Sequence, residues 1–318
     1  MNRSAAIRTL PIPVLAGPTA SGKTALSLEM AARYPVEIIS ADAMMVYRGM
    51  DIGTAKPSSS ERGNIVHHMI DLIEPGDEYS VSTWVAQAEK IIGDILSRKR
   101  IPLVVGGTGF YIRSLAQGLP TTPASNQNAI AQLEAELANK GLDVMLAELE
   151  KASPEDAIRA ERNPRRILRA LEIYRATGKP PSAFALKPAA YLYSKVVLLP
   201  PRGSLEARIE ARTKAMIEAG LIMEAAELSL DFVKDGKRLT SFQAIGYKQA
   251  MDHLTGVIQL EEVERRINLA TRQLAKRQET WFKAEPDASI LTTTEDARIE
   301  LDARLERWHT MYNERGWK

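Results

Sequence analysis

The sequence contains no cysteine, and this absence removes a whole class of chemistry. Without a thiol the chain has no cysteine nucleophile, no disulfide framework, and no zinc or iron–sulfur site with cysteine ligands. It also lacks any uninterrupted apolar run close to the roughly 20 residues that a membrane-spanning helix needs. Any reaction must therefore use oxygen and nitrogen groups with a hard metal ion, and we expect a soluble, cytoplasmic protein with no membrane contact.

Aromatic residues are scarce, at 6% of the chain, and the net charge is only +2. A balance this close to neutral does not by itself indicate a nucleic-acid partner. The 318 residues are 45% hydrophobic, which is enough for a well-buried core and predicts one large domain or slightly more. Function therefore has to be sought in local motifs and in the distribution of charge.

One stretch near the start carries the clearest motif. An apolar segment, Ile12–Ala16, has the pattern of a strand and runs into G-x-x-x-x-G-K-[ST] over residues 17–24. In such a phosphate-binding loop (P-loop), typical of nucleotide and ATP sites, backbone N–H groups and a helix N-terminus attract phosphate. A chance glycine turn is disfavoured because the motif lies between a predicted strand and a predicted helix. The predicted diphosphate or nucleotide site comprises Gly17, Pro18, Thr19, Ala20, Ser21, Gly22, Lys23 and Thr24, with Thr24 as the Mg²⁺ ligand.

A carboxylate follows the second predicted strand. Residues 36–42 end at Asp42, at the edge where open parallel sheets place their ligands. From position alone Asp42 could hold Mg²⁺, anchor a substrate hydroxyl, act as a general base, or be an ordinary loop carboxylate. The strand at 101–105 lacks the acidic residue that holds Mg²⁺ in NTP-hydrolysing motors, and it ends instead in two glycines and Thr108. The sequence therefore disfavours an ATPase.

The middle of the sequence differs from its two ends. Between residues 120 and 188 no segment has the pattern of a core strand, and the parallel-strand pattern resumes only at 196–199. Helices are expected at 130–140, 142–151, 163–177, 205–230, 242–254, 260–283 and 294–312. We therefore predict an α/β fold with a P-loop NTPase-like parallel sheet flanked by helices, built from residues 1–119 and 193–318, and a helical insertion domain at 120–192.

Basic residues gather in two segments, at residues 159–175 and 265–283. Such clusters are the electrostatic footprint of a polyanion, although each could equally be a solvated helix face. Within the first segment, Arg165, Arg166 and Arg169 cannot all lie on one face of a helix. Some of these side chains are therefore expected to contact phosphate while others pack or pair internally.

A further phosphate contact is possible after the insertion. Arg208 and Arg212 lie one turn apart in the predicted helix at 205–230. They could face phosphate together or be ordinary surface residues.

Several separated motifs together resemble one family, the tRNA dimethylallyltransferases, also called tRNA isopentenyltransferases. A P-loop alone is common, but this series of motifs in this order is specific, and the resemblance extends over residues 10–285. The motifs are GPTASGKT at 17–24, ISAD at 39–42, VYRGMDIGTAKP at 46–57, HHMID at 67–71, VGGTGFY at 105–111, RALE at 169–172, AIGYK at 244–248 and AKRQETWF at 275–282.

The resemblance implies transfer of a dimethylallyl group from dimethylallyl diphosphate, with Mg²⁺, to the exocyclic N6 amine of the adenine 3′-adjacent to a tRNA anticodon. It implies that the P-loop and Arg212 hold the diphosphate, that Asp42 is the general base, and that Thr108 contacts the substrate base or the transferring group. The partners would be dimethylallyl diphosphate and the anticodon stem-loop of tRNA, and we expect a monomer. The residues implied to contact tRNA are Asp42, Ala43, Met44, Met45, Thr108, Arg165, Arg166, Ile167, Leu168 and Arg169.

The chain departs from the family pattern at a few positions. The family commonly has a serine after the catalytic aspartate, where this chain has Ala43. An arginine usually found early in the insertion falls at Ile130, and an Asn-Asp pair is replaced by Arg162 and Asn163. These departures concern the contacts with tRNA rather than the reaction class.

Three rival interpretations remain beside the resemblance. A small-molecule kinase would share the P-loop and an aspartate after the second strand. An isopentenyltransferase acting on free adenine nucleotides would need neither the insertion nor the two basic clusters. A non-catalytic RNA-binding module would not need Lys23 and Asp42 together.

Overall fold

The structure is a computed structural model that describes residues 10–232 and 239–314. The chain divides into two compact units, of which the smaller is Gln117–Ala189 and the larger contains the remainder. The insertion expected at residues 120–192 and the smaller unit cover nearly the same stretch, with both boundaries of the unit earlier by three residues. No helix in the described ranges is long and apolar enough to cross a membrane.

The larger unit is built on a six-stranded sheet with the order β3-β2-β4-β1-β7-β8. Every neighbouring pair is parallel, which confirms the predicted α/β class. The two middle strands, β1 and β4, are almost continuously apolar because both faces of the sheet are covered. The strands are β1 (Ile12–Ala16), β2 (Val36–Ser40), β3 (His67–His68), β4 (Ile101–Gly106), β7 (Tyr193–Leu198) and β8 (Ala288–Leu291).

The register places the carboxyl ends of the central strands at one level. Ala16, the last residue of β1, pairs with Gly106 of β4 and with Val197 of β7. Ser40, the last residue of β2, pairs with Val105. The loops that leave β1, β2 and β4 therefore meet along one edge of the sheet, where open parallel sheets bind their ligands.

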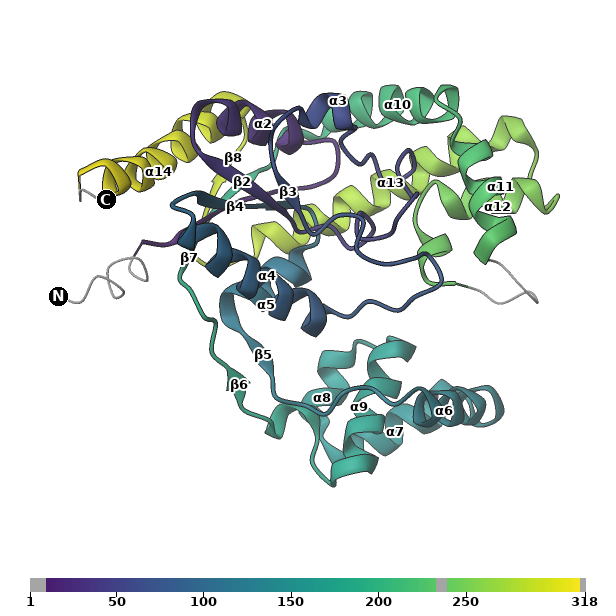
Figure 1. Cartoon of the computed structure of the whole chain (residues 1–318). Helices are drawn as coiled ribbons and strands as arrows, with labels where there is room; N and C mark the ends of the chain where they lie inside the picture. The colour runs from purple at the N-terminus through teal and green to yellow at the C-terminus, as the bar shows by residue number, and fades with distance from the viewer. Residues whose placement is uncertain (1–9, 233–238, 315–318) are drawn as a thin grey trace. The chain divides into compact units, whose positions relative to one another are not determined.

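Helices cover both faces of this sheet (Figure 1). On one face α2 (Lys23–Arg33) packs against α14 (Thr294–Glu314). On the other lie α4 (Val81–Ser97) and α5 (Gly109–Gln117). The rings of Trp84 on α4 and Tyr111 on α5 stack with their centroids 4.7 Å apart, and both side chains are buried. This stack joins the two helices beneath the sheet.

Two helices predicted as continuous are divided in the structure. The helix expected at 205–230 breaks at Gly220, whose φ is +100°, and the one expected at 242–254 breaks at Gly246, whose φ is +97°. A left-handed φ favours glycine and cannot continue a right-handed helix. The resulting elements are α10 (Arg202–Glu218), α11 (Leu221–Phe232), η2 (Ser241–Gln243) and α12 (Tyr247–Leu254).

Two further helices complete the larger unit. The short α3 (Ser59–Arg62) is capped by the preceding Ser58, whose side chain accepts the Glu61 N–H in a capping box. The long α13 (Leu260–Lys283) packs against α10 and α12, and Figure 1 shows α10 and α13 side by side.

The smaller unit is a group of helices with its own apolar core. The core includes Leu133, Met145, Leu149, Ile167 and Leu171. The predicted helices of this region are confirmed, but α8 and two short antiparallel strands were absent from the prediction. The elements are β5 (Leu119–Pro120), α6 (Gln127–Lys140), α7 (Leu142–Ala152), α8 (Pro154–Ala160), α9 (Pro164–Thr177), η1 (Pro181–Ala183) and β6 (Leu186–Lys187).

Candidate functional site

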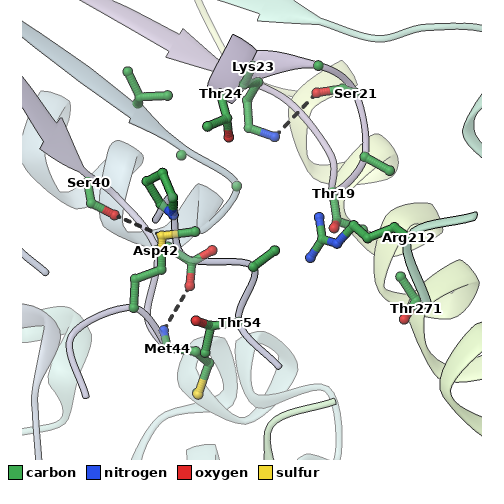
Figure 2. Close-up of a pocket in the computed structure, with 18 of the residues that line it drawn as sticks. Thr19, Ser21, Lys23, Thr24, Ser40, Asp42, Met44, Thr54, Arg212 and Thr271 are labelled. Carbon is green, nitrogen blue, oxygen red and sulfur yellow. Dashed lines mark hydrogen bonds between the residues drawn. The ribbon is translucent and has the colours of Figure 1, made fainter. Parts of the chain in front are cut away.

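The carboxyl edge of the sheet opens into a cavity of about 530 Å³ in the larger unit (Figure 2). Its lining brings together the loop after β1, the loop after β2, the glycines after β4, and side chains from α10 and α13. This volume is within the usual range for sites that bind a small molecule. The loops that carry the predicted site residues therefore surround one cavity.

The P-loop has a backbone that depends on its two glycines. Gly17 has a φ of +150°, and a Cβ there would lie 2.3 Å from the carbonyl oxygen of Leu198 on the neighbouring strand. Gly22 has a φ of +101° and immediately precedes α2. Residues 19–24 line the cavity, whereas Gly17 and Pro18 do not. The loop thus presents its second half and the start of α2 to any bound anion.

Lys23 is held by its own loop. Its Nζ donates hydrogen bonds to the carbonyl oxygen of Pro18 at 2.6 Å and to Oγ of Ser21 at 3.3 Å, the second of which is drawn in Figure 2. Burial lowers the pKa of Lys23 to about 7, while Asp42 raises it and Arg212 lowers it further. An anion beside this ammonium group would favour its charged form.

Two arginines approach the P-loop from α10. Arg208 donates a hydrogen bond of 3.2 Å to the carbonyl oxygen of Ser21, so it is engaged with the loop itself. Arg212, one turn later, points its guanidinium into the cavity (Figure 2). Burial lowers the pKa of Arg212, and the nearby Asp42 carboxylate opposes this. The residue predicted to contact diphosphate is therefore placed to reach a ligand on the P-loop.

Asp42 faces the cavity from the loop after β2 (Figure 2). One of its carboxylate oxygens accepts the N–H of Met44 at 2.8 Å, which fixes the side chain in a local turn. Met44 and Met45 also line the cavity. The Asp42 carboxylate and the Lys23 and Arg212 cations interact electrostatically, so one carboxylate and two cations share one cavity.

Thr108 lies beside the cavity and supports the Asp42 loop. Its hydroxyl accepts the N–H of Ala43 at 3.1 Å, and its own N–H donates to the carbonyl oxygen of Ala41 at 3.1 Å. The preceding Gly106 is so close that a Cβ on it would lie 2.1 Å from that same Ala41 oxygen. These contacts therefore fix the turn after β4 and the loop after β2 relative to each other.

Sequence reasoning missed a second wall of the cavity. This wall is mainly apolar and comes from α10, α13 and the segment before α12; its residues include Met216, Ala244, Ile245, Ile267 and Leu274. These side chains are separated along the chain and form no compact motif, so only the fold brings them together. An apolar wall beside a phosphate site suits a ligand with a hydrocarbon group.

The loop at residues 51–56 is fixed by a carboxylate that the sequence analysis also missed. Glu224 on α11 accepts the backbone N–H groups of Asp51 at 3.2 Å and Ile52 at 3.0 Å, and the hydroxyl of Tyr247 at 2.5 Å. A Cβ on Gly53 would lie 2.3 Å from the Tyr247 ring. Since Gly53 lines the cavity, these contacts set the position of one of its edges.

The donor groups present fit the predicted Mg²⁺ site. Thr24 lines the cavity, and within residues 10–232 and 239–314 its hydroxyl has no hydrogen-bond partner. Those residues contain no cluster of three or more His, Cys, Asp or Glu side chains able to hold a metal ion. Mg²⁺ in phosphate-binding enzymes is commonly held by one or two protein oxygens together with substrate phosphates and water. The Thr24 hydroxyl could serve as one such protein oxygen.

Most of the first arginine cluster is already paired within the smaller unit. Arg166 contacts Glu161 at 2.6 Å, and Arg169 contacts the buried Glu172 at 2.5 Å. Arg165 is exposed and has no partner among the described residues. Ile167 and Leu168, which the resemblance also implied to contact tRNA, have their side chains buried in the core of this unit. The tRNA contact of this segment stays a prediction.

The second basic cluster lies on α13, and part of it is also paired. Arg265 and Arg266 both contact Glu262, and Lys283 contacts Glu279. Two cations of this helix have no partner in the described part of the chain, Lys276 and Arg277, and both line a second, shallow hollow beside Trp281. These are the cations of α13 that remain available to an external anion.

A protein-family model and individual proteins of known sequence both match most of this chain. The family model described as IPP transferase matches residues 45–285. The chain is 48% identical over 297 residues to the tRNA dimethylallyltransferase of Deinococcus radiodurans, covering 93% of this chain and 97% of that protein. It is 49% identical over 275 residues to the tRNA dimethylallyltransferase of Thermus thermophilus, covering 86% and 90%.

Solved structures are similar over nearly the same span. The tRNA isopentenylpyrophosphate transferase of Bacillus halodurans is 33% identical with a TM-score of 0.69, covering 95% of this chain and 99% of that one. A eukaryotic dimethylallyltransferase, solved while acting on tRNA, is 27% identical with a TM-score of 0.76, covering 95% and 78%. The similarity thus extends far beyond the P-loop.

Proposed function

The chain belongs to the IPP transferase family, and we propose that it transfers a dimethylallyl group from dimethylallyl diphosphate to the N6 amine of the adenine 3′-adjacent to a tRNA anticodon. The relatives named above are tRNA dimethylallyltransferases. The observation that carries the proposal is the shared cavity, in which Lys23 and Arg212 lie within electrostatic reach of the Asp42 carboxylate. The cavity can thus hold the leaving diphosphate near the carboxylate that accepts a proton from the attacking amine.

The chemistry needs charge compensation on the leaving group and a proton acceptor at the nucleophile. The bond between the allylic carbon and the diphosphate oxygen breaks while a bond from N6 to that carbon forms. Negative charge then develops on the diphosphate, where the P-loop N–H groups, Lys23 and Arg212 stabilise it. The amine loses one proton, which Asp42 accepts. Mg²⁺ bound through Thr24 would neutralise further charge on the diphosphate.

Binding of the RNA requires that the target base leave its stack. An adenine inside a folded anticodon loop cannot reach a cavity of this kind unless it is flipped out, which costs a few kcal/mol of unstacking. Contacts to the phosphate backbone repay part of that cost, and Arg165, Lys276 and Arg277 are cations available for them. A tRNA substrate also supports a cytoplasmic location.

A transfer assay tests the proposal. The purified protein is incubated with radiolabelled dimethylallyl diphosphate, Mg²⁺ and either unmodified tRNA or AMP. We expect label in tRNA, at the adenine 3′ of the anticodon after nuclease digestion, and none in AMP. Removal of Mg²⁺ with a chelator should abolish the transfer. Label in AMP alone would identify an enzyme of free nucleotides, and transfer of the ATP γ-phosphate to a metabolite would identify a kinase.

A further inference from the structure

Gln278, on α13, uses its whole side-chain amide to join two backbone segments of the cavity wall. Its Oε1 accepts the N–H of Thr19 at 2.8 Å, and its Nε2 donates to the carbonyl oxygen of Gly107 at 2.8 Å. Thr19 belongs to the P-loop and Gly107 to the turn after β4. One neutral side chain thus ties the phosphate loop to that turn, although Gln278 and Thr19 are separated by 259 positions in the sequence.

The turn after β4 is closely fitted against α13. A Cβ on Gly107 would lie 2.7 Å from Nε2 of Gln278, and a Cβ on Gly109 would lie 2.2 Å from the ring of Trp281. Gln278 and Trp281 are three residues apart and so lie on one face of the helix. This face therefore supports the turn on both sides of Thr108.

On the side away from α13, the same turn is hydrogen-bonded to the loop that carries Asp42. Thr108 exchanges hydrogen bonds with Ala41 and Ala43, the two neighbours of Asp42. A displacement of the turn would therefore move the Asp42 loop as well. Because Gln278 is part of α13, the position of this helix sets the spacing between the P-loop and the Asp42 carboxylate.

α13 is itself firmly anchored at this level. The Arg113 guanidinium stacks over the Trp281 ring at 4.1 Å from its centroid and contacts Glu285 at 3.0 Å. Glu285 is buried and also contacts the buried Lys195 of β7 at 2.9 Å. Gln278 thus lies on a helix that these contacts hold in place, as accurate placement of reacting groups requires.

We propose that Gln278 is a positioning residue that fixes the distance between the diphosphate held by the P-loop and the base Asp42. The inference rests on the proposed function, which assigns those two roles. An amide suits the position because it offers one acceptor and one donor at the same time. A carboxylate could not donate to Gly107 and would bring negative charge next to the diphosphate loop. Misplacement of reacting groups by about 1 Å can cost on the order of 100-fold in rate.

The test compares two variants that disturb the same contact from opposite sides. Gln278→Met keeps the length of the side chain and removes both hydrogen bonds. Gly107→Ala retains the glutamine but adds a Cβ 2.7 Å from its amide nitrogen, which must then move away. Each should lower kcat by about 10- to 100-fold, with tRNA affinity unchanged and the protein still folded at the assay temperature. The double variant should be little worse than the poorer single one, since both act through one contact.

The control is Gln273→Met, an exposed position on the same helix, which should leave kcat unchanged. The inference is overturned if Gln278→Met retains full kcat, or if only the KM for the diphosphate rises, which would make Gln278 a direct ligand of the substrate. A parallel loss of thermal midpoint and tRNA affinity would also overturn it, because the role would then be structural. Transfer by the unaltered protein in the same assay separates these outcomes from failure of the proposed function.

Discussion

The ammonium group of Lys23 donates a hydrogen bond of 2.6 Å to the carbonyl oxygen of Pro18, five residues earlier in the same loop. Without an anion, this carbonyl and the Ser21 hydroxyl are its hydrogen-bond acceptors among the described residues. Burial therefore lowers the pKa of Lys23 to about 7. A bound diphosphate would supply the negative charge that the free loop lacks.

Replacement of Lys23 by Ala should weaken diphosphate binding. Loss of one hydrogen bond to a charged group costs roughly 1.5–3 kcal/mol, which corresponds to about a 10- to 150-fold increase in Kd. Calorimetric titration with dimethylallyl diphosphate measures the change, and tRNA affinity serves as the control. Unchanged diphosphate affinity would contradict the assignment of residues 17–24 as the phosphate site.

Diphosphate affinity should also fall as the pH rises above 7. Lys23 in the free protein loses its proton near pH 7, whereas the bound anion holds the proton in place. Binding above pH 7 must therefore take up a proton, and affinity falls by as much as about tenfold for each pH unit. Calorimetry at pH 7 to 9 in buffers of different ionisation enthalpy measures this uptake. Lys23→Ala should show no such uptake, and an equal uptake in both proteins would assign it to another group.

Replacement of Asp42 by Asn should lower turnover by about 10²–10⁴-fold, the usual contribution of a positioned base. The amide oxygen of Asn can still accept the Met44 N–H, so the turn and both substrate affinities should persist. Single-turnover transfer at saturating tRNA and diphosphate measures the step. Retained turnover with an altered dependence on Mg²⁺ would make Asp42 a metal ligand.

Arg165 and Arg169 should behave differently when each is replaced by Ala. Arg165 is free to contact RNA, so its loss should reduce the salt slope of log K for tRNA by about 0.7, the value for one single-stranded phosphate. Loss of Arg169 should instead destabilise the protein, because the buried Glu172 carboxylate loses its cation. The control is Arg159→Ala, whose guanidinium contacts Glu155 at 2.6 Å and which should leave the slope unchanged. Equal slope changes for Arg165→Ala and Arg169→Ala would contradict this distinction.

Replacement of Gly106 by Ala should destabilise the larger unit by about 1–3 kcal/mol or more. The new Cβ would lie 2.1 Å from the backbone oxygen of Ala41, which cannot move without separating β2 from β4. Urea unfolding measures the effect. Gly203→Ala is the matched control, because a Cβ there has no neighbour within 4 Å, and it should be neutral or slightly stabilising. Equal stability of the two variants would show that the close approach at Gly106 is relieved without cost.

The sequence was sufficient where the signal is local. The parallel sheet was predicted from short apolar segments, and its class is confirmed. Lys23 and Asp42 were found because each follows a strand in a short motif, and the structure places both in one cavity. Their roles stay predictions, as does that of Thr24 in holding Mg²⁺.

The sequence was insufficient where contacting residues are far apart in the chain, and where a backbone conformation leaves no periodic pattern of apolar residues. No pattern connects Gln278 with Thr19, and the apolar wall around Ile267 is assembled by folding alone. The break at Gly220 was missed because a single glycine is tolerated inside many helices, and only its left-handed φ ends this one. Ile167 was included in the predicted RNA contact because its motif was taken whole. It lies about 200° around the helix from Arg165, and its side chain is in the core.

The smaller unit begins and ends in a two-stranded antiparallel stem, with Leu119 directly opposite Lys187. Opposite residues of such a pair have their Cα atoms about 5 Å apart, so the polypeptide leaves and returns at one place. A single in-frame insertion at this place adds the whole unit to an ancestral gene, and a single in-frame deletion removes it, without a change in the order of the sheet strands. The helical unit can therefore be gained or lost at the level of the gene without disturbing the strands that carry the phosphate-binding loop.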